Sequence, residues 1–330
     1  MQLVINTYGT YVHIKDELFE VRVKKEGKEE KHHFAAQKVT SILLSKGSAI
    51  STDAVILAMK NNIDILIFEY DGTPVGRFWH SRPGSTSKIR KSQLEASLNE
   101  TGLQWVKLWL TGKAGNQIEF LKRLKKNRAT RAEEIQDVIN KIGEQKRKIE
   151  ETKGENISDV DGRLRGLEGT AGRYYFQLLS QLLPKEHQFA GRSFRPARDP
   201  FNAFLNYAYG ILYSRVEKTL TIAGLDPFVG FMHRDDYNMK SLVFDFIEPY
   251  RIIAEEVIFK LFAAKKVNKS HCDKITNGYS LNSEGKNLLV QHFFKFFDED
   301  KVRHKGRNQS RSNALQLDAH HFANQLIKKS

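Results

Sequence analysis

The first part of the chain, residues 1 to about 86, alternates apolar and polar positions at the short period that is typical of strands. Runs rich in β-branched and aromatic residues predict strands at residues 3–5, 11–14, 18–23, 39–44, 63–68 and 75–79. The charged stretch 24–31 interrupts the alternation and predicts an exposed turn. Asp71-Gly72 predicts a tight hairpin turn between the last two strands. Short strands at this spacing predict a small β-sandwich.

One short helix is expected inside this region, with Ser51 or Thr52 as its N-cap and apolar residues from Val55 to Met59 on its buried side. Proline, glycine and serine then cluster at residues 82–87, where the periodicity changes, and this cluster predicts a linker.

The rest of the chain follows the helical period. We expect helices at 103–126, 130–153, 158–183 and 201–220, one starting at Ser241, one starting at Asn282, and a last one ending at Ile327. Thr130 and Glu133 have the spacing of a capping box, and Ser241 is a candidate cap. Residues 230–236 and 303–311 are predicted as polar loops. The expected fold is therefore α+β with two domains: an N-terminal β-sandwich in 1–86 and a larger all-helical domain in 87–330.

The helix from Ser158 to Pro184 contains an unusual group of glycines at its centre. Gly166, Gly169 and Gly172 each cost roughly 1 kcal/mol relative to alanine in a helix interior. Either a neighbouring helix packs closely against them, or they keep space open for a ligand. Glu168 lies among them, about 60° from the middle of the apolar stripe at ~100° per residue.

The charge balance favours a polyanionic partner. Lys plus Arg number 53 and Asp plus Glu number 39, which gives a net charge of +14 and favours nucleic acid binding through counterion release. The alternative is a protein with a merely basic surface. Five positive charges lie in residues 122–128, where they contact phosphate or simply cap a solvated helix end.

Composition narrows the class further. Cys272 is the only cysteine, so an intrachain disulfide and a thiolate metal cluster are excluded. The start of the chain lacks the features of a secretory signal, and no apolar run is long enough for a bilayer; we expect a cytoplasmic protein. Phosphate-binding glycine loops and the Gly-x-Ser-x-Gly elbow of hydrolases are absent.

Four side chains could form a metal site: Glu168, His233, Asp245 and Glu248. Several carboxylates with one imidazole suit Mg²⁺ or Mn²⁺. Taken alone, the pattern also fits a surface histidine and two solvent-facing acids, so the residues themselves leave the choice open.

Four motifs follow one another in the helical part of the chain: Leu167–Phe176, Arg195-Pro196 with Asp199–Gly210, Gly224–Pro227 with Gly230–His233, and Ser241–Arg251. In order and spacing they resemble those of a known family, the CRISPR-associated Cas-one proteins, which are adaptation integrases and endonucleases.

The resemblance implies an N-terminal β-sandwich that forms a homodimer, a helical catalytic domain, and a Cas-two protein that bridges two dimers. It implies a metal site formed by Glu168, His233 and Glu248, with Asp245 close by. It also implies integration of short DNA into a CRISPR array, in which a 3′-hydroxyl attacks a repeat phosphodiester, and cleavage of double-stranded or single-stranded DNA with water as the nucleophile.

Phosphate contacts are expected from five arginines, whose alternatives are pairing with carboxylates and solvation at the surface: Arg165, Arg173, Arg195, Arg198 and Arg251. Two rival functions are a non-catalytic DNA-binding scaffold with the same fold and a stand-alone repair nuclease.

Overall fold

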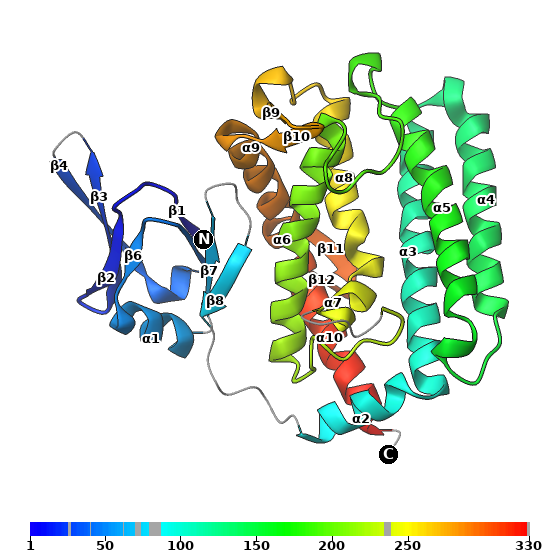
Figure 1. Ribbon diagram of the computed structural model, residues 1–330, viewed down its shortest axis with the longest axis horizontal. Helices are drawn as coiled ribbons and strands as arrows, with labels where there is room; N and C mark the ends of the chain where they lie inside the picture. Colours follow the sequence, from blue (N-terminus) through cyan, green and yellow to red (C-terminus); the bar gives the residue numbers. More distant parts are fainter. Residues whose placement is uncertain are drawn as a thin grey trace. The chain divides into compact units, whose positions relative to one another are not determined.

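The computed structural model describes residues 1–25, 28–39, 41–61, 63–69, 74–78, 87–233 and 239–328. The chain divides into two compact units, residues 1–83 and 84–330 (Figure 1). The predicted linker at 82–87 lies outside the described residues except for Ser87, which begins a helix.

The first unit is rich in strands, as predicted. Its strands are β1 (Gln2–Ile5), β2 (Tyr11–Lys15), β3 (Leu18–Lys25), β4 (Lys28–Ala35), β5 (Ser41–Ser45), β6 (Ala49–Ile50), β7 (Asp64–Phe68) and β8 (Pro74–Phe78). They form two four-stranded sheets, in the orders β1-β5-β7-β8 and β4-β3-β2-β6. The first sheet is parallel except for its β7–β8 edge.

Apolar side chains from both sheets form the core of this unit. Val12 and Phe19 from one sheet and Ile42 and Ile65 from the other are all fully buried in it, so the alternation in the sequence identified the buried faces correctly. Helix α1 (Thr52–Lys60) begins at its predicted cap, where Ser51 Oγ accepts a hydrogen bond from the Ala54 N–H at 3.2 Å.

The prediction of an exposed turn over residues 24–31 was wrong. Strand β3 continues to Lys25 and pairs antiparallel with β4 from Lys28 onward. The charged residues misled the prediction because β4 is an edge strand with exposed side chains, as at residues 29–33. The Asp71-Gly72 turn lies outside the described residues; the strands on either side of it, β7 and β8, do pair antiparallel.

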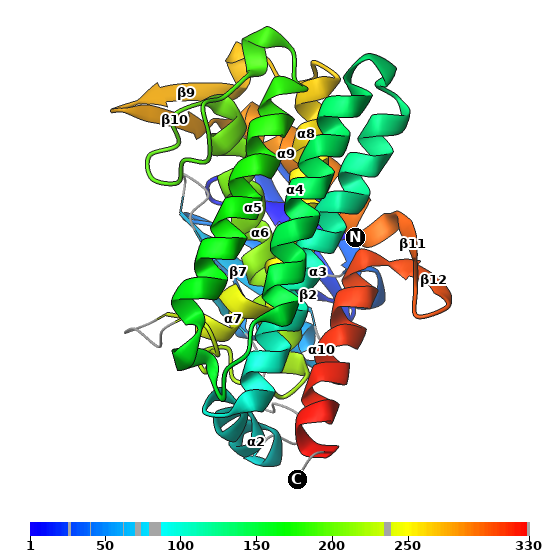
Figure 2. The ribbon, with the colours of Figure 1, turned by 90° about the vertical axis from the view of Figure 1, so that its right-hand side faces the viewer.

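The second unit is mainly helical. Its helices are α2 (Ser87–Ser97), α3 (Glu100–Lys126), α4 (Ala132–Glu151), α5 (Asp161–Gln181), α6 (Pro200–Ile222), α7 (Ser241–Phe246), α8 (Arg251–Ala263), α9 (Ser283–Phe294) and α10 (Arg311–Lys328). Helices α3, α4 and α5 lie side by side (Figure 2). Asp199 caps α6, and Asn282 caps α9, the helix expected to start at Asn282.

Aromatic rings tie distant parts of this unit together. The Phe322 ring of α10 contacts Trp109 of α3, Phe231 and Phe246, at centroid distances of 5.2, 5.9 and 6.1 Å. This cluster lies in the core of the helical unit and connects α3, α7 and α10 with the loop before α7.

Four details differ from the sequence predictions. Two short hairpins accompany the helices, β9 (Cys272–Ile275) with β10 (Gly278–Leu281) and β11 (Lys301–His304) with β12 (Arg307–Ser310); the second of these replaces the predicted loop 303–311. Thr130 lies in a 3₁₀ turn and forms no capping box, because α4 begins after Arg131.

The helix expected from Ser241 is also interrupted. Ser241 is its first residue rather than its cap, and a 3₁₀ turn at Glu248–Tyr250 separates α7 from α8. Pro249, which has no N–H to donate, lies in this turn. The overall prediction of a strand-rich unit followed by a larger helical one is confirmed.

Candidate active site

A cavity of about 700 Å³ opens in the helical unit. Helix α5 provides one wall, and α3, α6, the loop around residues 190–192, His233 and the Glu248–Arg251 turn provide the others. Its lining residues are Lys113, Glu168, Gly169, Gly172, Arg173, Phe176, Gln177, Ala190, Gly191, Arg192, Tyr209, His233, Glu248 and Arg251. Three of the predicted metal ligands, Glu168, His233 and Glu248, therefore face one cavity.

The three central glycines of α5 have open space beside them. A Cβ atom built on Gly166, Gly169 or Gly172 would meet no atom within 4 Å, which favours open space over close helix packing, the two alternatives that the sequence left open. Gly169 and Gly172 both line the cavity. They are three residues apart, so they lie on the same face of the helix, and Gly169 directly follows Glu168 in the sequence. Their role is to leave space beside the carboxylate.

Lys113 lies between the two glutamates of the site. Its ammonium group forms an ion pair with Glu168 Oε1 and a second one with Glu248 Oε2 at 2.7 Å. Only 11% of the Lys113 side chain is exposed, and burial alone would lower its pKa; the charges of Glu248 and Glu168 outweigh this effect and raise the pKa. The sequence analysis did not identify Lys113.

Glu248 is buried and held from two sides. Its Oε1 accepts a hydrogen bond from Arg251 Nε at 2.8 Å, while Oε2 faces Lys113 without hydrogen-bond geometry. Burial would raise the pKa of this carboxyl, but Arg251 and Lys113 lower it to about 2. Helix α3 fixes the turn itself, because Asn116 Nδ2 donates to the Pro249 carbonyl at 2.7 Å.

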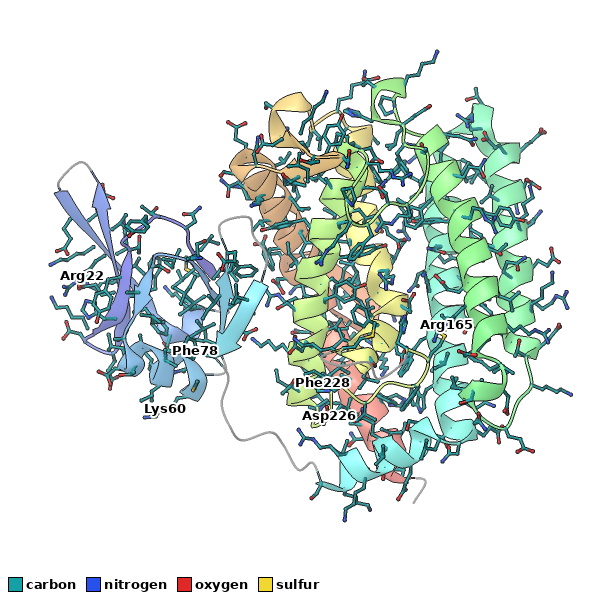
Figure 3. The ribbon with its side chains drawn as sticks, viewed as in Figure 1. Arg22, Lys60, Phe78, Arg165, Asp226 and Phe228 are labelled. Atoms are coloured by element: carbon teal, nitrogen blue, oxygen red, sulfur yellow. The ribbon has the colours of Figure 1, made fainter. Side chains whose placement is uncertain are left out.

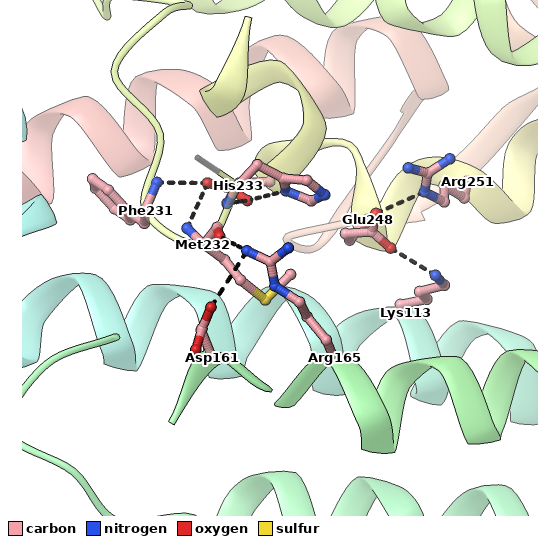
Figure 4. Close-up of polar contacts among 9 residues, drawn as sticks. Lys113, Asp161, Arg165, Phe231, Met232, His233, Glu248 and Arg251 are labelled. Carbon is pink, nitrogen blue, oxygen red and sulfur yellow. Dashed lines mark hydrogen bonds and ion pairs between the residues drawn. The ribbon is translucent and has the colours of Figure 1, made fainter. Parts of the chain in front are cut away.

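Asp245 organises the loop that carries Phe231, Met232 and His233, three residues that are labelled in Figure 4. Its Oδ2 accepts the backbone N–H groups of Phe231 and Met232 at 2.6 and 3.0 Å, and its Oδ1 accepts that of His233 at 3.1 Å. Oδ1 also lies 2.6 Å from His233 Nδ1. A carboxylate is acceptor-only, so Nδ1 carries the proton, and in the neutral imidazole Nε2 has the lone pair.

The four acidic and imidazole candidates thus separate into two groups. Glu168, His233 and Glu248 line the cavity, whereas the oxygens of Asp245 are engaged with backbone N–H groups and with His233. Asp245 and Glu248 lie three residues apart, but they contact different partners because the helix breaks between them.

Positive side chains surround the acids. Arg173, Arg192 and Arg251 line the cavity together with Lys113. Arg192 donates to Asn206 Oδ1 at 2.9 Å, its guanidinium lies over the rings of Phe176 and Tyr209 at 5.6 and 5.5 Å, and burial lowers its pKa. In the sequence, the only indication that Arg192 belongs to the site is its position in a basic segment.

The other arginines expected at phosphates are distributed differently. Arg165 donates to the Met232 carbonyl and pairs with Asp161 at 3.6 Å (Figure 4); its place on α5 is seen in Figure 3. Arg195 lies over the ring of Phe194 at 5.2 Å. Of the five predicted contacts, only Arg173 and Arg251 line the cavity; Arg165, Arg195 and Arg198 do not.

The chemistry of the donors fits a divalent cation. Glu168 and Glu248 already share one positive group, and the buried Glu248 Oε2 has no hydrogen bond. His233 adds a nitrogen whose second ring atom is held by a carboxylate, an arrangement common to metal-binding histidines. In their present positions, the described residues contain no group of three or more His, Cys, Asp or Glu side chains that could hold a metal ion.

Comparison with known proteins identifies the family. The family model described as "CRISPR associated protein Cas1" matches residues 3–295. A CRISPR-associated endonuclease Cas1 from Archaeoglobus fulgidus is 30% identical over 330 residues, which is 97% of this chain and 94% of the relative.

Solved structures share the fold. A casposase bound to its integration product matches with a TM-score of 0.82 and 21% identity, over 100% of this chain and 91% of the casposase. A chain of a Cas6-RT-Cas1–Cas2 complex matches with a TM-score of 0.77 and 20% identity, over 100% of this chain and 35% of the larger one.

No helix among the described residues is both long and apolar enough to cross a membrane. The family resemblance drawn from four motifs is confirmed over nearly the whole chain, and the chain belongs to the family of CRISPR-associated Cas1 proteins.

Proposed function

We propose that this protein is a metal-dependent integrase and endonuclease of CRISPR adaptation, which joins the 3′-hydroxyl ends of short foreign DNA to the repeat of a CRISPR array. The observation that carries the proposal is the cavity of about 700 Å³ in which Glu168, His233 and Glu248 meet four cationic side chains. Family membership supports the biological setting.

The cationic side chains favour a phosphate in this cavity. Four positive groups face two carboxylates, so the site attracts an anion even when both glutamates are ionised. Arg173 is exposed and available for a phosphate oxygen, whereas Arg251 is occupied by Glu248. Arg192 is held by Asn206 and by the rings of Phe176 and Tyr209, which fixes the position of its charge.

The reaction is a transesterification. The 3′-oxygen of the incoming DNA forms a bond to a repeat phosphorus as the bond from that phosphorus to its own 3′-oxygen breaks. The attacking hydroxyl loses a proton, the leaving 3′-oxygen gains one, and the number of phosphodiester bonds is unchanged. With water as the nucleophile, the same exchange becomes cleavage.

The site residues prepare the reacting groups. Mg²⁺ or Mn²⁺, held by Glu168, His233 and Glu248, would supply Lewis-acid polarisation of the phosphate. Asp245 holds the Nδ1 proton of His233 and so keeps the Nε2 lone pair available. Arg251 orients Glu248, and the glycines of α5 leave room beside Glu168.

The proposed partners are double-stranded and single-stranded DNA, a second copy of this chain joined through the strand-rich unit, and a Cas2 protein bridging two such dimers. The shared fold with a casposase bound to an integration product and with a chain of a Cas6-RT-Cas1–Cas2 complex supports the DNA and Cas2 partners.

Strand transfer into a supercoiled plasmid that carries a CRISPR repeat tests the proposal, with Mg²⁺ or Mn²⁺ and with or without the Cas2 protein. Glu168→Ala should reduce strand transfer by at least about 10³-fold while it leaves salt-sensitive DNA binding in place, because the carboxylate acts on the reacting phosphate. Glu119→Ala is the matched control: Glu119 is an exposed glutamate on α3 that pairs only with its neighbours.

Full strand transfer by Glu168→Ala would contradict the assigned site. Strand transfer absent from the unaltered protein under all these conditions, with DNA binding intact, would favour the scaffold function instead. Cleavage without any strand transfer would favour a repair nuclease.

A further inference from the structure

The proposed reaction assigns no role to Lys113. Its ammonium group pairs with both Glu168 and Glu248, the same two carboxylates that would hold a divalent cation. A lysine here neutralises the acids when no metal is bound, since two adjacent carboxylates, one of them buried, would repel each other without a cation.

We infer that Lys113 is a built-in competitor of the divalent cation, whose ammonium group must leave the glutamate pair before the metal binds and which thereby sets the metal concentration at which the enzyme becomes active. This inference rests on the metal-dependent function proposed above.

The two cationic partners of Glu248 differ in how firmly they are held. Arg251 donates to Glu248 Oε1, and its guanidinium lies over the rings of Tyr209 and Tyr213 at 5.0 and 5.5 Å. It is a fixed partner that orients the carboxylate. Lys113 lies 2.7 Å from Oε2 and also donates to Glu168 Oε1, but no ring packs against its ammonium group among the described contacts, and it stands at the end of a flexible four-carbon stem. Lys113 is therefore the exchangeable partner.

The backbone around Lys113 is well anchored, so exchange requires only side-chain movement. A Cβ atom on Gly112 would lie 3.3 Å from Pro249 Cβ, and Asn116 donates to the Pro249 carbonyl, so α3 is packed tightly against the Glu248 turn. Lys113 also lines the cavity, and its ammonium group can move along the cavity wall toward solvent or toward a bound phosphate.

The glutamates would remain in place after such a movement. Glu248 keeps Arg251, and Glu168 is partly exposed to the cavity, with open space beside it at Gly169 and Gly172. A small divalent ion with its waters could then replace the ammonium group without any change in the helices.

The experiment measures Mn²⁺ binding to the full chain without DNA, by calorimetry and by the electron paramagnetic resonance signal of free Mn²⁺. Lys113→Met should bind Mn²⁺ about tenfold or more tightly, because the competing charge is gone. Lys113→Arg, which keeps the positive charge, should retain weak binding. Glu168→Gln added to Lys113→Met should abolish the gain, which ties it to this site.

Lys107→Met is the matched control. Lys107 is a half-buried lysine on the same helix whose ammonium donates to the Thr152 carbonyl at 2.8 Å rather than to an acid, so its removal should leave Mn²⁺ affinity unchanged. Lys113→Gln, which retains a polar group between the glutamates, provides a second neutral variant if Lys113→Met fails to fold, and it should also bind Mn²⁺ more tightly.

Unchanged or weaker Mn²⁺ binding by folded Lys113→Met or Lys113→Gln would overturn the inference. The proposed function fails separately: strand transfer by the unaltered protein would then be absent with Mg²⁺ or Mn²⁺, whatever the Mn²⁺ affinity of Lys113→Met.

Discussion

The carboxylate of Asp245 accepts hydrogen bonds from three consecutive backbone N–H groups and from the imidazole of His233. One side chain therefore fixes both the loop and the tautomer of the histidine that it carries. The close approach of Gly230 to the start of α7, where a Cβ atom would lie 2.4 Å from Ser241 Cβ, keeps the loop near enough for these bonds.

Asp245→Asn should loosen this loop. The amide keeps one acceptor oxygen and directs an N–H₂ group at backbone donors, so buried hydrogen bonds are lost at about 1–3 kcal/mol each. We expect the backbone amides of Phe231, Met232 and His233 to exchange hydrogen at least about tenfold faster. Exchange measured by NMR or mass spectrometry checks this result.

Asp226→Asn is the matched control for that exchange measurement. Asp226 lies earlier in the same connection between α6 and α7 (Figure 3), and its carboxylate accepts the backbone N–H of Phe228 at 3.0 Å rather than those of residues 231–233. Equal exchange rates at residues 231–233 in Asp245→Asn and the unaltered protein would show that Asp245 does not hold the loop.

Some residues of the site could be predicted from the sequence, and one important residue could not. Glu168, His233 and Glu248 could be singled out because carboxylates and imidazoles are recognisable metal ligands and lie in family motifs. Lys113 could not, because it contacts Glu168 and Glu248 only after the chain brings together residues 55 and 135 positions apart. Nothing in the local sequence distinguishes Lys113 from any other lysine on an amphipathic helix.

At the scale of elements, the central glycines of helix α5 lower the stability of the helix and leave open space beside Glu168. Its three central glycines have helical geometry and no neighbour within reach of a Cβ atom. Each therefore weakens the helix without improving its packing. Two of them line the cavity, which gives the loss of stability a function.

A comparison of Gly172→Ala with Gly166→Ala separates the effect on helix stability from the effect on the space in the cavity. Both should stabilise the protein, by up to about 1 kcal/mol each in denaturant unfolding, because alanine favours the helix and meets no clash. Only Gly172→Ala should lower strand transfer, by about tenfold, since Gly172 lines the cavity and Gly166 does not. Equal activity in the two variants would show that the space beside Glu168 is not used.

The helix breaks were harder to predict than the helices. Periodicity located α3, α5 and α6 within a few residues, because each buries a long apolar stripe. The break at Glu248–Tyr250 contains Pro249, whose missing N–H is a signal in the sequence for a kink, although the sequence does not show where the two helices end. Strand β4 is a charged edge strand defined only by its partner β3, and its own apolar pattern gave no signal.

At the scale of the whole molecule, each unit has its own core and its own buried charges. In the strand-rich unit, Glu20 is buried and accepts a hydrogen bond from Arg22 at 2.7 Å, with His13 and His33 at 2.9 and 2.7 Å. Arg22, seen in Figure 3, makes the largest contribution to lowering the pKa of Glu20 to about 2, and the two histidines add to it against the effect of burial.

This cluster makes the strand-rich unit sensitive to acid. The pKa of Glu20 is lower in the folded state than its ordinary value of 4.5, so its stabilising effect is complete above about pH 4.5 and is lost as the pH falls toward 2. Glu20→Gln should flatten the pH dependence of stability in this window. Hydrogen exchange of peptides from β2–β4 reports on this unit alone.

Glu30→Gln serves as the control for acid sensitivity. Glu30 is an exposed carboxylate on the neighbouring strand β4, 3.7 Å from His32, so the pH dependence of exchange should match that of the unaltered protein. An unaltered acid response in Glu20→Gln would mean that another group governs this unit.

The ring of Phe322 has a consequence for the order in which the protein is made. It lies against Phe231, whose N–H is bound by Asp245, and against Phe246 of α7. A nascent chain emerges from the ribosome N-terminal end first, so the histidine loop lacks this support until residue 322 has been synthesised. A ribosome-bound or prematurely terminated chain would thus carry Glu168, Glu248 and the histidine loop without the aromatic ring that packs against that loop.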